Sequence, residues 1–153
     1  MVWLKVLHIV CMFGTVTLFV GGEVILAGVA RSGDVRALRR VGAVTKKTDA
    51  LGVLLFVAGI GFGIATALTG HFDLTAPWLI TAYVLVGLAF ALGFGYFTPR
   101  YERMMRAAEA SPDDTPSEGL ARLLDPRKET AIIVFDILLW GSLIYVMVAK
   151  PFA

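Results

Sequence analysis

Residues 51–68, LGVLLFVAGIGFGIATAL, form an unbroken apolar stretch without one charged side chain. A helix needs about 20 mostly apolar residues to cross a bilayer. Three further apolar stretches of similar length begin at Val2, Trp78 and Ala131. We therefore predict an all-α membrane protein, a four-transmembrane-helix bundle in a single domain. The expected helices cover about residues 2–29, 50–69, 77–98 and 129–149.

The composition of the 153-residue chain supports this fold class. Hydrophobic residues make up 58% of the chain and charged residues 17%, whereas soluble domains average about 45–50% and about 25%. This excess argues against a disordered chain and against an ordinary soluble domain. The single cysteine, Cys11, excludes an intramolecular disulfide and a cysteine-based zinc site.

The basic residues predict the orientation in the membrane. Twelve of the 14 lysines and arginines fall in residues 31–47 and 100–128, and residues 69–76 contain none. By the positive-inside rule the two basic segments face the cytoplasm, and both termini face outward. The first apolar stretch is long and contains Glu23, so we interpret it as a retained helix rather than a signal peptide. We expect a multi-pass protein of the bacterial cytoplasmic (inner) membrane, N-out/C-out.

The first basic segment has a helical pattern of its own. Val35, Leu38 and Val41 recur every three residues. This spacing predicts a short amphipathic helix on the inner membrane surface, capped by Ser32, with a solvated basic loop as the alternative. Between the apolar positions lie three arginines that would attract anionic lipid: Arg36, Arg39 and Arg40. Since basic charge here also serves topology, we expect the lipid bilayer and no nucleic acid as a partner.

The second basic segment is expected to contain two helical pieces. The third helix should continue over residues 101–110 after Pro99, before a turn at residues 111–116 and a short helix over 117–124. Asp125 is the expected cap of the fourth helix, with Pro126 at its first position.

Small residues at helical spacing predict close helix packing. They form three sets: Gly59 and Gly63, Gly14 and Gly22, and Gly87 with Ala91 and Gly95. We favour packing within the chain over dimerisation, and a homo-oligomer or a larger membrane complex stays open as the alternative.

Ionisable groups at membrane depth are candidates for function. His8 lies near the outer start of the first helix, and Cys11 and Met12 share its helical face. Imidazole and sulfur suit copper or haem iron, so these three residues are candidate metal ligands. His71 is a candidate second cofactor ligand. The alternative is a structural His8 that bonds to a neighbouring helix.

Acidic residues form the second candidate site. Glu23 and Asp136 are expected about 9 Å from the cytoplasmic ends of their helices, and Asp49 is slightly shallower. These carboxyls could form a proton relay with Tyr96, or they could form structural ion pairs. The candidate basic partners are Arg31, Lys46 and Lys47. Motifs of soluble enzymes, such as a P-loop or Gly-x-Ser-x-Gly, are missing from the sequence, and whether the protein is an enzyme is left open.

The opening residues 4–9, LKVLHI, followed by Gly14 and by Gly21-Gly22, resemble the start of a group of small bacterial integral membrane proteins. This group is related to copper-resistance protein D and to the HemJ-type protoporphyrinogen oxidases. The resemblance implies a four-helix membrane fold. In the HemJ-type family the histidine that matches His8 binds haem b, and a later helix carries a lysine that the three later apolar stretches here do not have. In copper-resistance protein D the related region is linked to copper uptake.

Together these patterns predict a small integral membrane protein that binds haem b or a soft metal near the outer leaflet through His8, with a redox-linked role as one expectation. Two alternatives stay open. One is a copper uptake or handling protein, and the other is a non-catalytic accessory subunit or assembly factor of a larger membrane complex.

Overall fold

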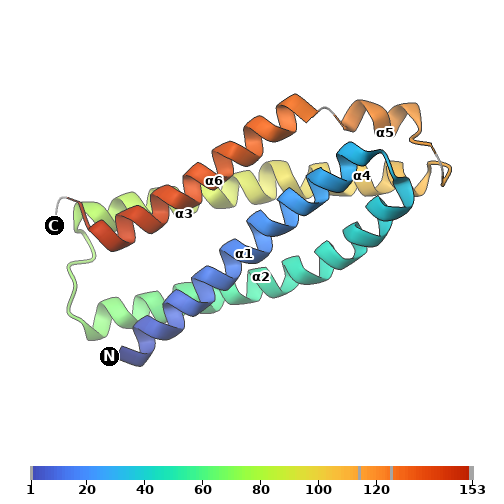
Figure 1. The fold of residues 1–153 in the computed structure, drawn as a ribbon. Helices are drawn as coiled ribbons and strands as arrows, with labels where there is room; N and C mark the ends of the chain where they lie inside the picture. Colours follow the sequence, from blue (N-terminus) through green and yellow to red (C-terminus); the bar gives the residue numbers. More distant parts are fainter. Residues whose placement is uncertain (1, 114, 125, 152–153) are drawn as a thin grey trace.

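The computed structural model describes residues 2–113, 115–124 and 126–151, and these residues form helices and turns without a strand (Figure 1). Within this described part, four helical segments are long and apolar enough to cross a membrane. They are Val2–Ser32, Val35–Thr69, Pro77–Glu109 and Arg127–Ala149. The prediction of an all-α protein with four helices long and apolar enough to span a membrane is confirmed.

Two long helices form an antiparallel hairpin. Helix α1 (Val2–Ser32) ends in a tight turn at Gly33, whose φ of 72° is left-handed backbone that suits glycine. Helix α2 (Val35–Thr69) begins directly after this turn. Figure 1 shows α1 and α2 side by side along most of their length.

The second half of the chain forms the other pair. Helix α3 (Pro77–Leu92), a π-helical turn η1 (Gly93–Phe97) and α4 (Thr98–Glu109) follow one another as one rod. The short α5 (Glu118–Leu123) precedes α6 (Pro126–Ala149), which returns beside α3. The two chain ends lie at one end of the bundle, and the α1–α2 turn lies with α5 at the other (Figure 1). We call this second end the basic end.

The core has two clusters of buried apolar side chains. One runs from the middle of the bundle toward the end that holds the chain termini, and it includes Phe56 of α2, Trp78 and Ala82 of α3 and Trp140 and Leu143 of α6. The other lies at the basic end and joins α1, α2, α4 and α5. Its buried members are Leu26, Ala30, Val35, Leu38, Met104, Ala108 and Leu120. Through the second cluster, the buried core continues past the apolar stretches into the two basic segments.

The outer surface of the long helices is apolar. Phe13 is 73% exposed, Val57 61% and Leu138 63%. Such contiguous apolar surface is rare on soluble monomers and is what lipid covers in a membrane protein. The long helices therefore have apolar side chains both on the faces that pack in the core and on the faces that lipid would cover.

The prediction of a separate amphipathic helix in the first basic loop is wrong. Residues 35–69 form one helix, and its N-cap is Asp34, whose Oδ1 accepts a hydrogen bond from the Ala37 N–H at 2.8 Å. Ser32 belongs to α1 and donates its hydroxyl to the Val29 carbonyl at 2.7 Å. The apolar side chains of this segment do not face the membrane surface, because Val35 and Leu38 are buried in the cluster with α4 and α5.

The glycine sets divide into packed and exposed ones. A Cβ on Gly63 would lie 2.9 Å from the His8 ring, and one on Gly14 would lie 2.9 Å from Leu55 Cδ1. Gly59 and Gly22 also face the opposite helix of the hairpin, so close packing within the chain is confirmed for the glycines of α1 and α2. The predicted stripe on the third helix does not pack within the described chain, since a Cβ on Gly87 or Gly95 would meet nothing within 4 Å, and Ala91 is exposed.

The second basic segment has the predicted pieces. The third span continues through η1 into α4, and Ser117 caps α5 by accepting from the Leu120 N–H at 3.3 Å. Arg39 joins this segment to α2, because its guanidinium bonds the Ala108 carbonyl at 2.8 Å and the Asp113 carboxylate at 2.7 Å. Helix α6 begins at Pro126 as predicted, while the predicted cap Asp125 lies outside the described residues.

Candidate functional site

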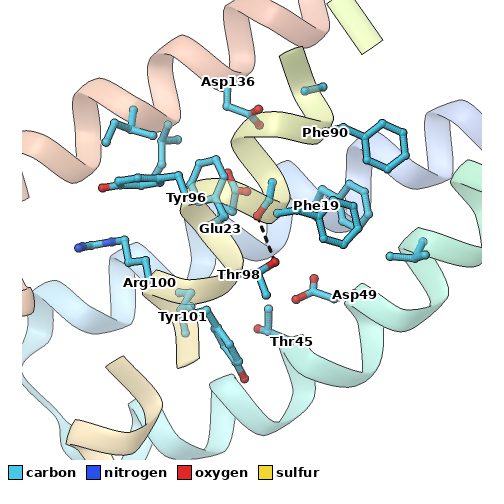
Figure 2. Close-up of a pocket in the computed structure, with 18 of the residues that line it drawn as sticks. Phe19, Glu23, Thr45, Asp49, Phe90, Tyr96, Thr98, Arg100, Tyr101 and Asp136 are labelled. Carbon is cyan, nitrogen blue, oxygen red and sulfur yellow. Dashed lines mark hydrogen bonds between the residues drawn. The ribbon is translucent and has the colours of Figure 1, made fainter. Parts of the chain in front are cut away.

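A cavity of about 370 Å³ lies between the two helix pairs, and Figure 2 shows the side chains around it. Its α2 wall runs from Thr45 to Val57, about 18 Å at 1.5 Å per residue. The exposed Lys46 and Glu102 lie toward the basic end, whereas the buried Phe56 and Trp140 lie toward the middle of the bundle. The cavity therefore extends from the basic end into the depth of the apolar spans.

The three acidic residues that the sequence predicted at one depth all line this cavity (Figure 2). Glu23 comes from α1, Asp49 from α2 and Asp136 from α6. Asp49 Oδ1 lies 3.9 Å from the Cβ position of Gly22, the residue before Glu23. Asp136 is only 4% exposed, and the Trp140 indole one turn later interacts with its side chain. Three helices thus each contribute one carboxyl to the same cavity.

Glu23 has an incomplete set of hydrogen bonds. Its Oε2 is fully buried, and no described residue bonds to it. A buried polar atom without a partner is costly, and native proteins retain few of them. Glu23 is among the residues that line the cavity, so its carboxyl is the candidate group for binding a ligand there.

The basic side chains expected to pair with these carboxyls form no ion pair with them in the described part of the chain. Arg31 donates to Thr130 Oγ1 at 2.7 Å, and Lys46 lines the cavity without forming a described ion pair. The ion pair at the cavity wall is a different one, in which Arg100 Nη2 lies 3.2 Å from Glu129 Oε1. Both partners are largely buried, with side chains 18% and 11% exposed. In the described part of the chain, Glu23, Asp49 and Asp136 therefore do not form the structural ion pairs that were the alternative to a proton relay.

The charge around the cavity is unbalanced. Five acidic side chains line it, Glu23, Asp49, Glu102, Glu129 and Asp136, against two basic ones, Lys46 and Arg100. Because such groups at membrane depth are poorly solvated, an excess of negative charge there favours a positive ligand or a proton.

The π-helical turn borders the same cavity. All of its residues except Gly95 line the cavity, together with Thr98, whose hydroxyl and N–H both reach back to the Gly93 carbonyl. A π-turn inserts an extra residue into a helix and is frequent at functional sites. Here it turns Tyr96 and Phe97 toward the cavity. Tyr96, which the sequence suggested as a partner of the carboxyls in a proton relay, thus lines the same cavity as they do.

Aromatic walls and the ion pair were not predicted from the sequence. Phe90 packs edge to face on Phe56 with ring centroids 4.8 Å apart and stacks on Phe94 at 5.5 Å. Phe19 of α1 also lines the cavity. The only sequence signal for this set was the density of aromatic residues around 90–97, which an apolar span alone would also explain.

His8 lies near the other end of α1 and does not line this cavity. Its Nδ1 donates a hydrogen bond to the Gly59 carbonyl at 2.7 Å, so Nε2 is the ring nitrogen that keeps a lone pair. Cys11 is buried, and Met12 Sδ would lie 2.7 Å from a Cβ on Gly59, so both side chains face α2 as His8 does. The predicted shared face is confirmed, and so is the bonding of His8 to a neighbouring helix.

His71 is not brought to His8. It follows the end of α2 in the exposed connection to α3, with a positive φ of 52°. His8 contacts Gly63, which lies seven residues, or about 10 Å, before Gly70 at the end of α2. Among the described residues no group of three His, Cys, Asp or Glu side chains is placed to hold a metal ion.

Comparison with protein-family models, with curated proteins and with solved structures finds no match to this chain.

Proposed function

We propose that this membrane protein binds a cation in the carboxylate-lined cavity between its two helix pairs. The single observation that supports this proposal is the buried Glu23 Oε2, which has no partner and lies beside Asp49 and Asp136. A buried carboxyl that stays charged is normally paired or bound to a cation. A cation in the cavity would satisfy Glu23 and offset the local excess of negative charge.

A thermal-stability assay in detergent tests the proposal. Purified protein is heated with chloride salts of sodium, potassium, magnesium and tetramethylammonium at constant ionic strength. We expect at least one cation to raise the unfolding midpoint, because a ligand that binds only the folded state stabilises it. The shift should be lost in Glu23→Gln and Asp136→Asn.

The matched control is Glu118→Gln, because Glu118 is exposed on α5 and lies away from the cavity. This variant should keep the full cation-dependent shift. If no cation shifts the midpoint of the wild-type protein, or if the shift persists in both cavity variants, the proposal fails.

We place the chain in the bacterial cytoplasmic membrane, N-out/C-out, with the basic end in the cytoplasm. The clustered arginines and lysines support this orientation. Anionic lipid headgroups are the proposed partners of Arg36, Arg39 and Arg40. Of these, Arg36 and Arg39 also form ion pairs with Asp113, at 3.3 Å and 2.7 Å, so lipid would share them with the protein.

A second candidate function is soft-metal binding at His8, including copper handling. It is favoured by the Nδ1–Gly59 hydrogen bond, because metal-binding histidines usually donate their other ring N–H to a carbonyl or carboxylate. Met12 sulfur on the same face would be the second ligand. Elemental analysis of protein purified with copper supplied tests it: copper should be present in wild type and lost in His8→Ala.

Haem b fits these residues less well than a soft metal does. His8 is packed on Gly63, and His71 lies beyond the end of α2, so the two histidines do not face a common space. The role of an accessory subunit or assembly factor stays a prediction from the sequence.

A further inference from the structure

The side chains that line the cavity and its volume indicate which kind of cation would fit. Apart from its acidic residues, the cavity is lined mainly by apolar and aromatic side chains, with Phe19, Phe90 and Tyr96 among those labelled in Figure 2. Its volume of about 370 Å³ falls in the range of about 300–1,000 Å³ that is usual for small-molecule sites. A bare inorganic ion would leave most of this space and nearly all of the aromatic surface unused.

The placement of the carboxyls also disfavours a metal ion. The described residues contain no group of three His, Cys, Asp or Glu side chains that could hold one. Calcium requires six to eight oxygen ligands, and magnesium requires near-octahedral geometry. Carboxyls spread over α1, α2 and α6 suit a larger cation that each can approach from a different side.

An organic ammonium ion satisfies both features. Its positive charge would pair with Glu23 and Asp136, while its apolar body would replace water against the rings. Aromatic rings pack edge to face or offset-stacked on one another, which adds about 0.5–1.5 kcal/mol to the burial of their area. The stacked pair Phe90–Phe94 at 5.5 Å and the edge-on Phe56 form a preassembled aromatic wall of the same cavity, with Phe56 buried and Phe94 exposed at its outer side.

We infer that the ligand class of this cavity is an organic ammonium ion with an apolar or aromatic body, an inference that rests on the proposed cation-binding function. The charged end lies at Glu23 and Asp136, and the body lies along Phe90 and Tyr96. The entry is at the basic end, where the cavity reaches the exposed Lys46 and Glu102.

Equilibrium dialysis of the full chain in lipid nanodiscs tests this inference with three probes. Benzyltrimethylammonium carries both charge and ring, tetramethylammonium carries the charge alone, and neopentylbenzene has the same shape as the first without charge. We expect benzyltrimethylammonium to bind about tenfold more tightly than either of the others. Empty nanodiscs measure the share taken up by lipid, which is subtracted.

Two pairs of variants locate the binding. Glu23→Gln should weaken benzyltrimethylammonium about tenfold or more and leave neopentylbenzene unchanged. Phe90→Leu should weaken benzyltrimethylammonium but not tetramethylammonium. The controls are Glu118→Gln, on the exposed α5, and Phe135→Leu, on the exposed face of α6, and both should bind as wild type does. If Glu23→Gln does not fold, Asp136→Asn provides the same comparison.

The outcomes separate the inference from the proposed function. If tetramethylammonium binds as tightly as benzyltrimethylammonium, the cation site stands and the apolar or aromatic body is wrong. If metal ions alone bind, the cation site stands and the organic ammonium class is wrong. If neopentylbenzene binds as tightly as its charged analogue, the cavity is an apolar site and both fail. If benzyltrimethylammonium does not bind, the inference is overturned, and the salt series decides the proposed function independently.

Discussion

At the scale of single residues, Asp73 in the α2–α3 connection has a pKa that can be tested directly. Its carboxylate accepts hydrogen bonds from the Thr75 hydroxyl at 2.6 Å and the Thr75 N–H at 2.8 Å. These bonds hold the pKa of Asp73 below its ordinary value. Because the folded-state pKa is lowered, the bonds stabilise the connection above the ordinary aspartate pKa of about 3.9, and this contribution is lost as the pH falls through the folded-state value.

Thr75→Val removes the hydroxyl donor and keeps the backbone one, so we expect the Asp73 pKa to rise partway toward its ordinary value. An NMR titration of the Asp73 carboxyl carbon measures it. Thr81→Val is the matched control, because the Thr81 hydroxyl bonds only the Pro77 carbonyl of its own helix. Equal Asp73 titrations in wild type and Thr75→Val would contradict the assigned cause.

The Arg100–Glu129 pair leads to a second prediction at this scale. Arg100→Gln leaves the mostly buried Glu129 carboxylate without its cation, and breaking such a pair costs about 3 kcal/mol. Arg106→Gln breaks the exposed Arg106–Glu102 pair, which contributes less than about 1 kcal/mol. Unfolding in a mild denaturing detergent should therefore show a large loss of stability for the first variant and a small one for the second. Equal losses would mean that burial does not govern the Arg100 pair.

At the scale of elements, the α1–α2 hairpin depends on close approach at its glycines. Gly63→Leu would push the His8 ring away and break its hydrogen bond to Gly59, so we expect a loss of about 1–3 kcal/mol. Gly87→Leu is the control, because that glycine faces open space on α3. Thermal midpoints in detergent compare the two, and a Gly87→Leu loss as large as that of Gly63→Leu would point to a partner on the α3 face.

Helix positions could be predicted because hydropathy and charge act locally along the chain. The continuity of the basic segment with the second apolar span in one helix could not be predicted. Val35 and Leu38 give the same sequence pattern whether they face lipid headgroups or α4. The π-turn at Gly93–Phe97 likewise has no local signal that separates it from α-helix. It forms where the third span carries Tyr96 toward the carboxyls.

The candidate site could be predicted in part for a related reason. Depth along a helix follows from counting residues, and this is why Glu23, Asp49 and Asp136 were correctly grouped. Rotation about the helix axis depends on packing between distant segments. The Arg100–Glu129 pair, the Phe90–Phe94 stack and the separation of His71 from His8 depend on that rotation or on loop geometry, so sequence patterns did not predict them.

At the scale of the whole molecule, orientation decides which compartment supplies the ligand of the cavity. The α1–α2 turn, α4 and α5 lie at one end, and both termini and the α2–α3 connection lie at the other (Figure 1). If the basic end faces the cytoplasm, as the positive-inside rule predicts, the cavity opens to cytoplasmic ligands.

A pair of reporter insertions tests this orientation. A phosphatase that is active only outside the cytoplasm should be active when inserted at Gly70, in the connection without basic residues, and inactive at Pro112, between α4 and α5. A fluorescent protein that matures only in the cytoplasm should give the opposite pattern at the same two sites. Phosphatase activity at Pro112 with none at Gly70 would invert the bundle and make the cavity open outward. The Asp73 connection would then lie in the cytoplasm, and the arginines at the other end could not bind the inner leaflet.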